Sequence, residues 1–252
     1  MAGNESSRTT ARKGSSGRGG PATYAGANFQ TLIGVREAVA LLGSLASHPW
    51  QGSTIAAEPR SFGENGQVGY DISLPGGRRR IEVKGAPTRA DVREFAATVR
   101  DDPAGIDELT TFEFIHGQSS KAVADLTEVG RAAREAPDQA HFGELVARMS
   151  DEQRELVSRL GADGWRRARQ IRSRYLPEAE ARMRVEWVTD RMYGEGPAKA
   201  VRDRLAARFA AAAEHREAFA VVDLRDELAA AGGQVQIAPI PDLTGGSVWC
   251  SV

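Results

Sequence analysis

The sequence predicts a mixed α/β (α+β) fold, with a core of one helix, three strands, a second helix and a fourth strand, followed by a helical region. Three observations predict it. Apolar residues recur every three or four positions in residues 27–45, short alternating runs occupy parts of residues 53–84, and helical spacing returns after Gly117. A length of 252 residues allows one large domain or two modest ones.

The amino-terminal segment divides into an arm and a helix. Residues 1–23 consist mainly of Gly, Ser, Thr and Arg, so we expect a disordered basic arm that either contacts a phosphate backbone or is only a solvated tail. From Ala27 the apolar spacing indicates a helix, which we expect to end at His48-Pro49.

Four strands are expected where apolar and polar residues alternate between turns rich in Gly, Pro and Asn. They lie at residues 53–58, 68–74, 78–84 and 110–116. In the last of them Phe112 and Phe114 fall on the same side, because side chains alternate along a strand.

A helix is expected between the third and fourth strands, and further helices after Gly117. Pro87 ends the third strand, and Thr88, with Asp91 three residues later, has the pattern of a helix N-cap. Other candidate N-caps are Ser119 or Ser120, Ser150 and Asp163. Residues 183–188 fit a short strand or part of a helix equally well.

Residues 163–176 carry many arginines around aromatic and apolar side chains, and we read them as a basic helix. Such a helix either follows a nucleic-acid backbone or is an exposed amphipathic helix whose aromatic residues join the core. The chain therefore divides into the arm, an α/β core at residues 24–135, and a helical region with a short tail at residues 136–252.

The composition excludes several classes of protein. Lys and Arg number 33 against 34 Asp and Glu, a net charge of −1 that excludes a uniformly basic nucleic-acid coat. The single cysteine, Cys250, cannot close a disulfide within the chain, and the four histidines lack zinc-binding spacing. No run approaches the roughly 18 apolar residues of a membrane helix. We expect a soluble, cytoplasmic protein with no membrane partner.

The second and third strands can form a hairpin with a two-residue turn at residues 76–77. Paired positions then add up to 153, so that Asp71 lies opposite Glu82. Residues two apart share a face, which places Asp71, Glu82 and Lys84 together on one side. The apolar side chains take the other side: Ile72, Leu74, Ile81 and Val83. A register shifted by one would break this separation.

Two convergent carboxylates suit a hard divalent cation such as Mg²⁺, or alternatively Mn²⁺. A nearby lysine can orient a nucleophile or stabilise negative charge on a scissile phosphate, and Lys84 is one of only four lysines in an arginine-rich chain. These groups are the equipment for phosphodiester hydrolysis. The same charges are also compatible with a plain solvated sheet face.

The order of elements, with Asp71 on the second strand and Glu82-Val83-Lys84 on the third, resembles the PD-(D/E)xK restriction-endonuclease-like superfamily and its αβββαβ core. More narrowly, residues 26–30 (GANFQ), 69–74 (GYDISL) and 80–85 (RIEVKG) resemble the amino-terminal nuclease domain of bacterial anti-phage effectors, which include cyclic-oligonucleotide-activated endonucleases and some STAND NTPases. The resemblance covers about residues 24–121.

The resemblance implies roles for individual residues. Asp71 and Glu82 would be the metal ligands and Lys84 the catalytic lysine, while Glu58 would be an accessory acid near the metal. Gln30, at the start of the first helix, would join the site. Glu37 is the alternative on that helix, unless it is a charge on the solvent-facing side.

The function implied is that of a metal-dependent endonuclease that hydrolyses DNA, with double-stranded DNA the expected substrate and anti-phage defence the expected setting. No lysine follows a glycine, so a Walker A loop is absent and sensing would need a sensor or NTPase partner protein, or a homo-oligomer. Two alternatives stay open. In the first, the same fold is a catalytically inactive module for nucleic-acid binding or protein assembly. In the second, the chain is a mostly helical interaction subunit.

Overall fold

The computed structural model describes residues 21–45, 54–57, 60–63, 66–74, 78–107, 109–215, 217–220 and 223–224. Its helices are α1 (Pro21–Leu45), α2 (Arg89–Asp101), the short 3₁₀ helix η2 (Pro103–Ile106), α3 (Lys121–Glu135), α4 (Gln139–Ala147), α5 (Asp151–Arg159), α6 (Gly164–Gln170), α7 (Glu178–Tyr193) and α8 (Glu195–His215). Its strands are β1 (Thr54–Ala57), β2 (Arg60–Gly63), β3 (Gly66–Gly69), β4 (Ile72–Leu74), β5 (Arg79–Lys84), β6 (Thr111–His116), β7 (Ile171–Tyr175) and β8 (Ala218–Ala220).

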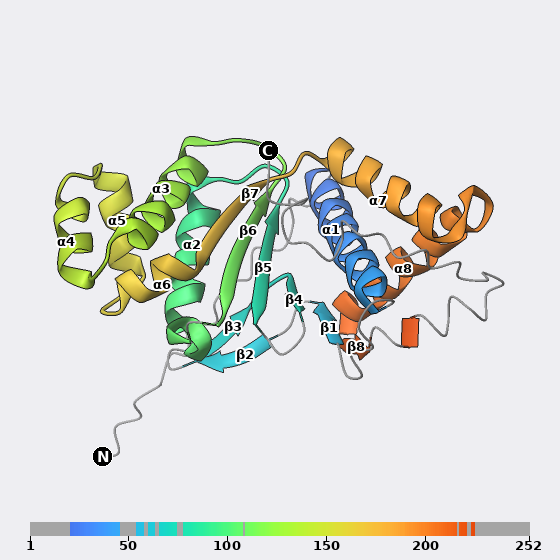
Figure 1. The fold of residues 1–252 in the computed structure, drawn as a ribbon, viewed down its shortest axis with the longest axis horizontal. Coiled ribbons are helices and arrows are strands. Elements are labelled where there is room, and N and C mark those ends of the chain that lie inside the picture. Colours follow the sequence, from blue (N-terminus) through green and yellow to red (C-terminus); the bar gives the residue numbers. More distant parts are fainter. Residues whose placement is uncertain are drawn as a thin grey trace, which may run out of the picture.

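A mixed sheet with the order β7-β6-β5-β4-β1-β8 lies at the centre of the molecule. Strands β1, β4 and β5 pair antiparallel, α2 crosses over to β6, and β6 and β7 continue parallel to β5. Helices α2 to α6 cover one face, and α1, α7 and α8 cover the other (Figure 1). Strands β2 and β3 form a separate two-stranded ribbon. The chain is therefore a mixed α/β protein.

Each face of the sheet has its own apolar core. Ile72, Ile81 and Ile115 pack against α1, α7 and α8, whereas Phe112 and Phe114 pack against α2 and α3. Successive side chains along β5 and β6 point to opposite faces and so join different cores, as the apolar pattern of these strands predicts.

Several local predictions are confirmed. The register of β4 and β5 is the predicted one, with Ile72 opposite Ile81. Thr88 caps α2 and forms a capping box with Asp91. Ser120 caps α3. The turn at residues 76–77 lies outside the described residues, as do residues 1–20 of the expected arm, and α1 already begins at Pro21.

The expected single strand at residues 68–74 is interrupted. Gly69 ends β3, and β4 begins only at Ile72, so the two halves belong to different sheets. The interruption lies at Tyr70 and Asp71, where the side chain of Asp71 takes the place of a backbone acceptor for the Val83 N–H (2.6 Å). The alternating pattern alone does not reveal such a replacement.

The helix expected over residues 163–176 is wrong in its second half, where the chain forms β7. Ile171 is buried and pairs with Phe112, which favours an extended backbone beside β6 over a further turn of helix. Strand β8 was also missed, so residues 136–252 are not purely helical: they add one strand to each end of the sheet. Residues 183–188, which the pattern left undecided, lie within α7.

No helix in the described part of the chain combines the length and apolar character required to cross a membrane.

Candidate active site

The predicted polar group of residues lies where β4 begins and β5 ends. Glu82 and Lys84 project from β5 toward the α2 side of the sheet, because each neighbours a buried residue that faces α1. Asp71 immediately precedes β4, and continuing the observed register places it opposite Glu82. The structure thus brings Asp71, Glu82 and Lys84 to one end of the hairpin.

Two hydrogen bonds hold the Asp71 carboxylate. Its Oδ2 accepts from the backbone N–H of Val83, and its Oδ1 accepts from the side-chain amide of Gln30. Gln30 comes from α1, which packs across β5 on the other face of the sheet. Gln30, which was predicted to join the site, therefore contacts it directly: its amide, on α1, orients the Asp71 carboxylate.

Glu82 and Lys84 form an ion pair, with Nζ of the lysine 2.8 Å from Oε1 of the glutamate. Burial raises the pKa of Glu82, and the charge of Lys84 only partly opposes this. Burial lowers the pKa of Lys84, but the negative charges of Glu82 and Asp71 outweigh it and the net pKa rises. Lys84 is therefore an ammonium ion held close to both carboxylates, and 32% of its side chain is still exposed.

The carboxyl ends of β5, β6 and β7 meet at this edge of the sheet because the three strands are parallel. His116 pairs with Lys84, and Tyr175, 55% exposed, pairs with His116. Burial lowers the pKa of His116, whose Nδ1 donates to the carbonyl oxygen of Gln118 (3.0 Å). Sequence reasoning missed both residues as neighbours of the site, because only the parallel register, which no local pattern encodes, brings them there.

The loops that follow β5 and β6 touch at this edge. A Cβ at position 117 would lie 2.9 Å from the carbonyl oxygen of Gly85, so glycine at position 117 permits this close approach. The backbone beside Lys84 is therefore held by the next loop.

The residues present fit a divalent cation. Asp71 and Glu82 supply carboxylate oxygens, which Mg²⁺ prefers, and the Glu82 carboxylate, 15% exposed, forms an ion pair with the ammonium of Lys84. Among the described residues no group of three or more His, Cys, Asp or Glu side chains forms a closed metal cage. Two protein carboxylates with open positions for water or phosphate match the way Mg²⁺ is usually held.

Two other acids were predicted as candidates for the site, Glu58 and Glu37. Glu58 lies outside the described residues. Glu37 is described, but it is 3% exposed and lies in a buried cluster of charges near the opposite end of β5. It is therefore neither a neighbour of Asp71 nor the solvent-facing charge that its residue type suggests.

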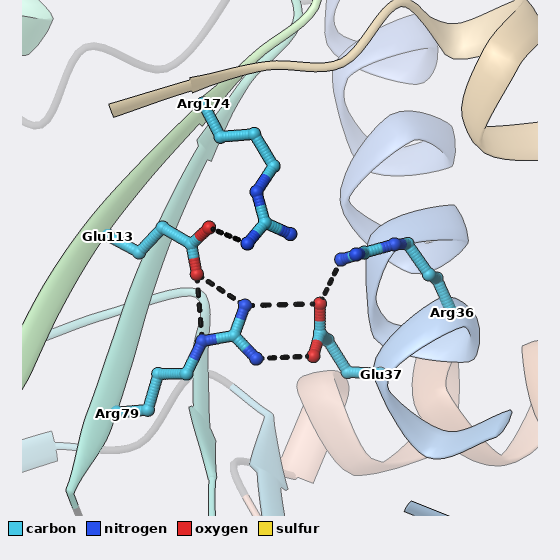
Figure 2. Close-up of polar contacts among 5 residues, drawn as sticks. All are labelled: Arg36, Glu37, Arg79, Glu113 and Arg174. Carbon is cyan, nitrogen blue, oxygen red and sulfur yellow. Dashed lines mark hydrogen bonds and ion pairs between the residues drawn. The ribbon is translucent and has the colours of Figure 1, made fainter. Parts of the chain in front are cut away.

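Five residues form this buried ion cluster between α1 and the sheet: Arg36, Glu37, Arg79, Glu113 and Arg174 (Figure 2). Arg79 binds Glu37 through Nη1 (2.7 Å) and Glu113 through Nε (2.8 Å), and Arg174 binds the other oxygen of Glu113 (2.9 Å). Arg36 contacts Glu37 from the same helix.

The ion cluster attaches α1 to three strands. Burial alone would raise the pKa of Glu37, but the charges of Arg79, Arg36 and Arg174 outweigh it and lower this pKa to about 2. Gln30 and Glu37 are seven residues apart, so two turns of helix place them on one side of α1. The helix is thus held at the candidate site by Gln30 and at the far end of β5 by Glu37.

Comparison of the chain with protein-family models, with curated proteins and with solved structures finds no match.

Proposed function

We propose that this protein is a metal-dependent nuclease that hydrolyses DNA phosphodiester bonds. The observation that carries the proposal is that the ammonium of Lys84 lies near two carboxylates, Glu82 in an ion pair and Asp71 through its charge, while the amide of Gln30 holds Asp71. The group lies at the edge where three parallel strands end, a common position for sites in α/β proteins.

Each side chain has a defined task in this proposal. A bound Mg²⁺ or Mn²⁺ supplies charge neutralisation at the phosphate and lowers the pKa of water. Asp71 and Glu82 hold the cation, and Gln30 together with the Val83 N–H keeps the Asp71 carboxylate in one orientation. Lys84, released from its pair with Glu82, places its positive charge on the scissile phosphate and stabilises the negative charge that develops there.

The choice of substrate rests on the resemblance to restriction-endonuclease-like nucleases. The order helix, three antiparallel strands, crossover helix and parallel strand, formed by α1, β1, β4, β5, α2 and β6, is the order expected of that core and supports the proposal. Double-stranded DNA, a role in anti-phage defence and a sensor or NTPase partner are parts of the same proposal.

The test is plasmid cleavage with and without Mg²⁺ by three nearly isosteric variants, Asp71→Asn, Glu82→Gln and Lys84→Met. Each should lower the cleavage rate by about 100-fold or more. Lys121→Met is the matched control, because Lys121 also pairs with an acidic side chain, Asp125 at 3.3 Å, but is itself 69% exposed. Thermal unfolding of every variant shows whether the fold is intact.

Cleavage retained by all three folded variants would refute the proposal. Binding of DNA without cleavage in Mg²⁺ or Mn²⁺ by the unmodified chain would do so as well, and would favour the inactive nucleic-acid-binding module. Loss of cleavage in Lys121→Met to the same extent would show that the assay reports a general effect of charge.

A further inference from the structure

A concave site lies at the opposite end of the sheet from Lys84. It is a pocket of about 630 Å³ beside the start of β6, between the end of α3, helix α6 and the start of β7. Its lining residues include four arginines, a tryptophan and two threonines, and none of them carries a carboxylate. The volume is that of a site for a small organic ligand.

Within the part of the chain that the structure describes, the four arginines of the pocket lack ionic partners. None of Arg134, Arg166, Arg169 and Arg172 forms an ion pair with another residue in the described ranges. Most other arginines in the described part of the chain form ion pairs, so this group of arginines differs from the rest of the surface. Only the carboxylates of Glu135, near Arg134, and Glu113, near Arg172, partly offset its positive charges.

Two of the arginines are held in place by the backbone. Arg134 donates to the carbonyl oxygen of Ile171 (2.7 Å), and Arg172 donates to that of Arg169 (2.6 Å). Burial lowers the pKa of both side chains, and the charge of Arg172 lowers that of Arg134 further. The pocket therefore holds its charges at a cost that a bound anion would relieve.

An aromatic ring completes the pocket. Trp165 is half-buried, and its indole Nε1 donates to the carbonyl oxygen of Ala133 (3.0 Å), which fixes the ring. The guanidinium of Arg169 stacks 5.0 Å from the centre of that ring. A flat aromatic ligand can stack on such a pair.

We propose that this pocket binds a nucleotide, with its phosphates among the arginines and its base stacked at the pair of Trp165 and Arg169. Guanidinium groups recognise phosphate by paired hydrogen bonds. The site is distinct from the candidate active site: Thr111 lines it, whereas His116 lies beside Lys84, and five strand residues span about 17 Å. The nucleotide can be a free molecule or one unit of a nucleic-acid strand.

Calorimetric titration of the full chain in EDTA tests the proposal, since no cleavage then interferes. The probes are ADP, adenosine, inorganic phosphate and a single-stranded oligonucleotide. The double variant Arg166→Ala/Arg169→Ala removes the two arginines whose side chains make no hydrogen bond to another described residue. It should weaken ADP binding at least about tenfold.

The matched control is Arg191→Ala. Arg191 also stacks on a tryptophan four residues earlier, with its guanidinium 5.1 Å from the ring centre of Trp187, but on a helix outside the pocket. Its variant should bind ADP as the unmodified chain does. Adenosine and phosphate should each bind more weakly than ADP, because each reaches only one part of the pocket.

The outcomes separate the two sources of ligand. Weaker ADP binding in the double variant supports a free nucleotide, and weaker oligonucleotide binding without any ADP binding supports a nucleic-acid strand. Binding of neither probe, or binding that the double variant leaves unchanged, would overturn the proposal. Phosphate binding as tight as ADP binding would overturn the role of Trp165 and with it the nucleotide. None of these results depends on the proposed hydrolysis.

Discussion

Replacing Glu37 by glutamine should destabilise the protein strongly and in a pH-dependent way. The substitution keeps the size of the side chain but removes the charge that faces Arg36 and Arg79 in the ion cluster. Only 4% of the Glu37 side chain is exposed, so water cannot replace the lost interaction. The guanidinium groups around it would stay buried with less compensation.

The size of the effect follows from the pKa of Glu37, which is about 2 in the fold against an ordinary 4.5. At about 1.4 kcal/mol for each unit of pKa, the carboxylate contributes about 3 kcal/mol to the free energy of unfolding at pH 7. Because the pKa is lowered by folding, this contribution is complete above about pH 5 and disappears as the pH falls through 2. At pH 3 about 1.4 kcal/mol should be left.

Urea denaturation of the unmodified chain and of Glu37→Gln, followed by circular dichroism between pH 7 and pH 3, measures this difference. The matched control is Glu135→Gln, which breaks an exposed pair with Arg131 and should cost less than about 0.5 kcal/mol. A difference below about 1 kcal/mol at pH 7 for Glu37→Gln, or one that does not shrink with acid, would refute the reasoning.

Three further changes test the packing and the proposed site. Gly34→Ala would bring a methyl group into the ring of Phe209 and should lower the free energy of unfolding by about 1–3 kcal/mol in urea denaturation; an unchanged midpoint would contradict the close helix packing. Thr88→Ala removes the capping box of α2 and should cost about 1 kcal/mol, which Thr88→Ser should largely restore. Lys84→Met should raise the pKa of Glu82 further, since burial already favours the neutral carboxyl, so Mn²⁺ binding should move to higher pH. A binding curve that stays in place would argue against this effect of Lys84.

The hairpin of the candidate site could be predicted because its two faces differ in polarity. Ile72 and Ile81 must share the buried side, which leaves one register and places Glu82 and Lys84 on the other side. The break at Asp71 was not predictable, since a side chain that substitutes for a backbone acceptor leaves no trace in an alternating pattern. Local patterns thus predicted how β4 pairs with β5, but not where β4 begins.

The ion cluster lay beyond sequence reasoning for a different reason. Glutamate is seldom buried, so Glu37 in isolation is expected in solvent. Apart from Arg36, the other members of the ion cluster come from three strands far along the chain, and the strand that carries Arg174 was itself read as helix. Recognising β7 from Ile171 onward would have been the first step, because the parallel pairing with β6 brings Arg174 to Glu113.

The positions of β7 and β8 restrict how this protein can be divided. These two late strands flank β6 and β1 at opposite borders of the sheet. A fragment ending at residue 135 would retain the four inner strands, yet both borders would present unpaired backbone N–H and C=O groups to other molecules. Such a fragment should self-associate or aggregate, so a truncation meant to isolate the candidate site would lose its architecture before its chemistry could be measured.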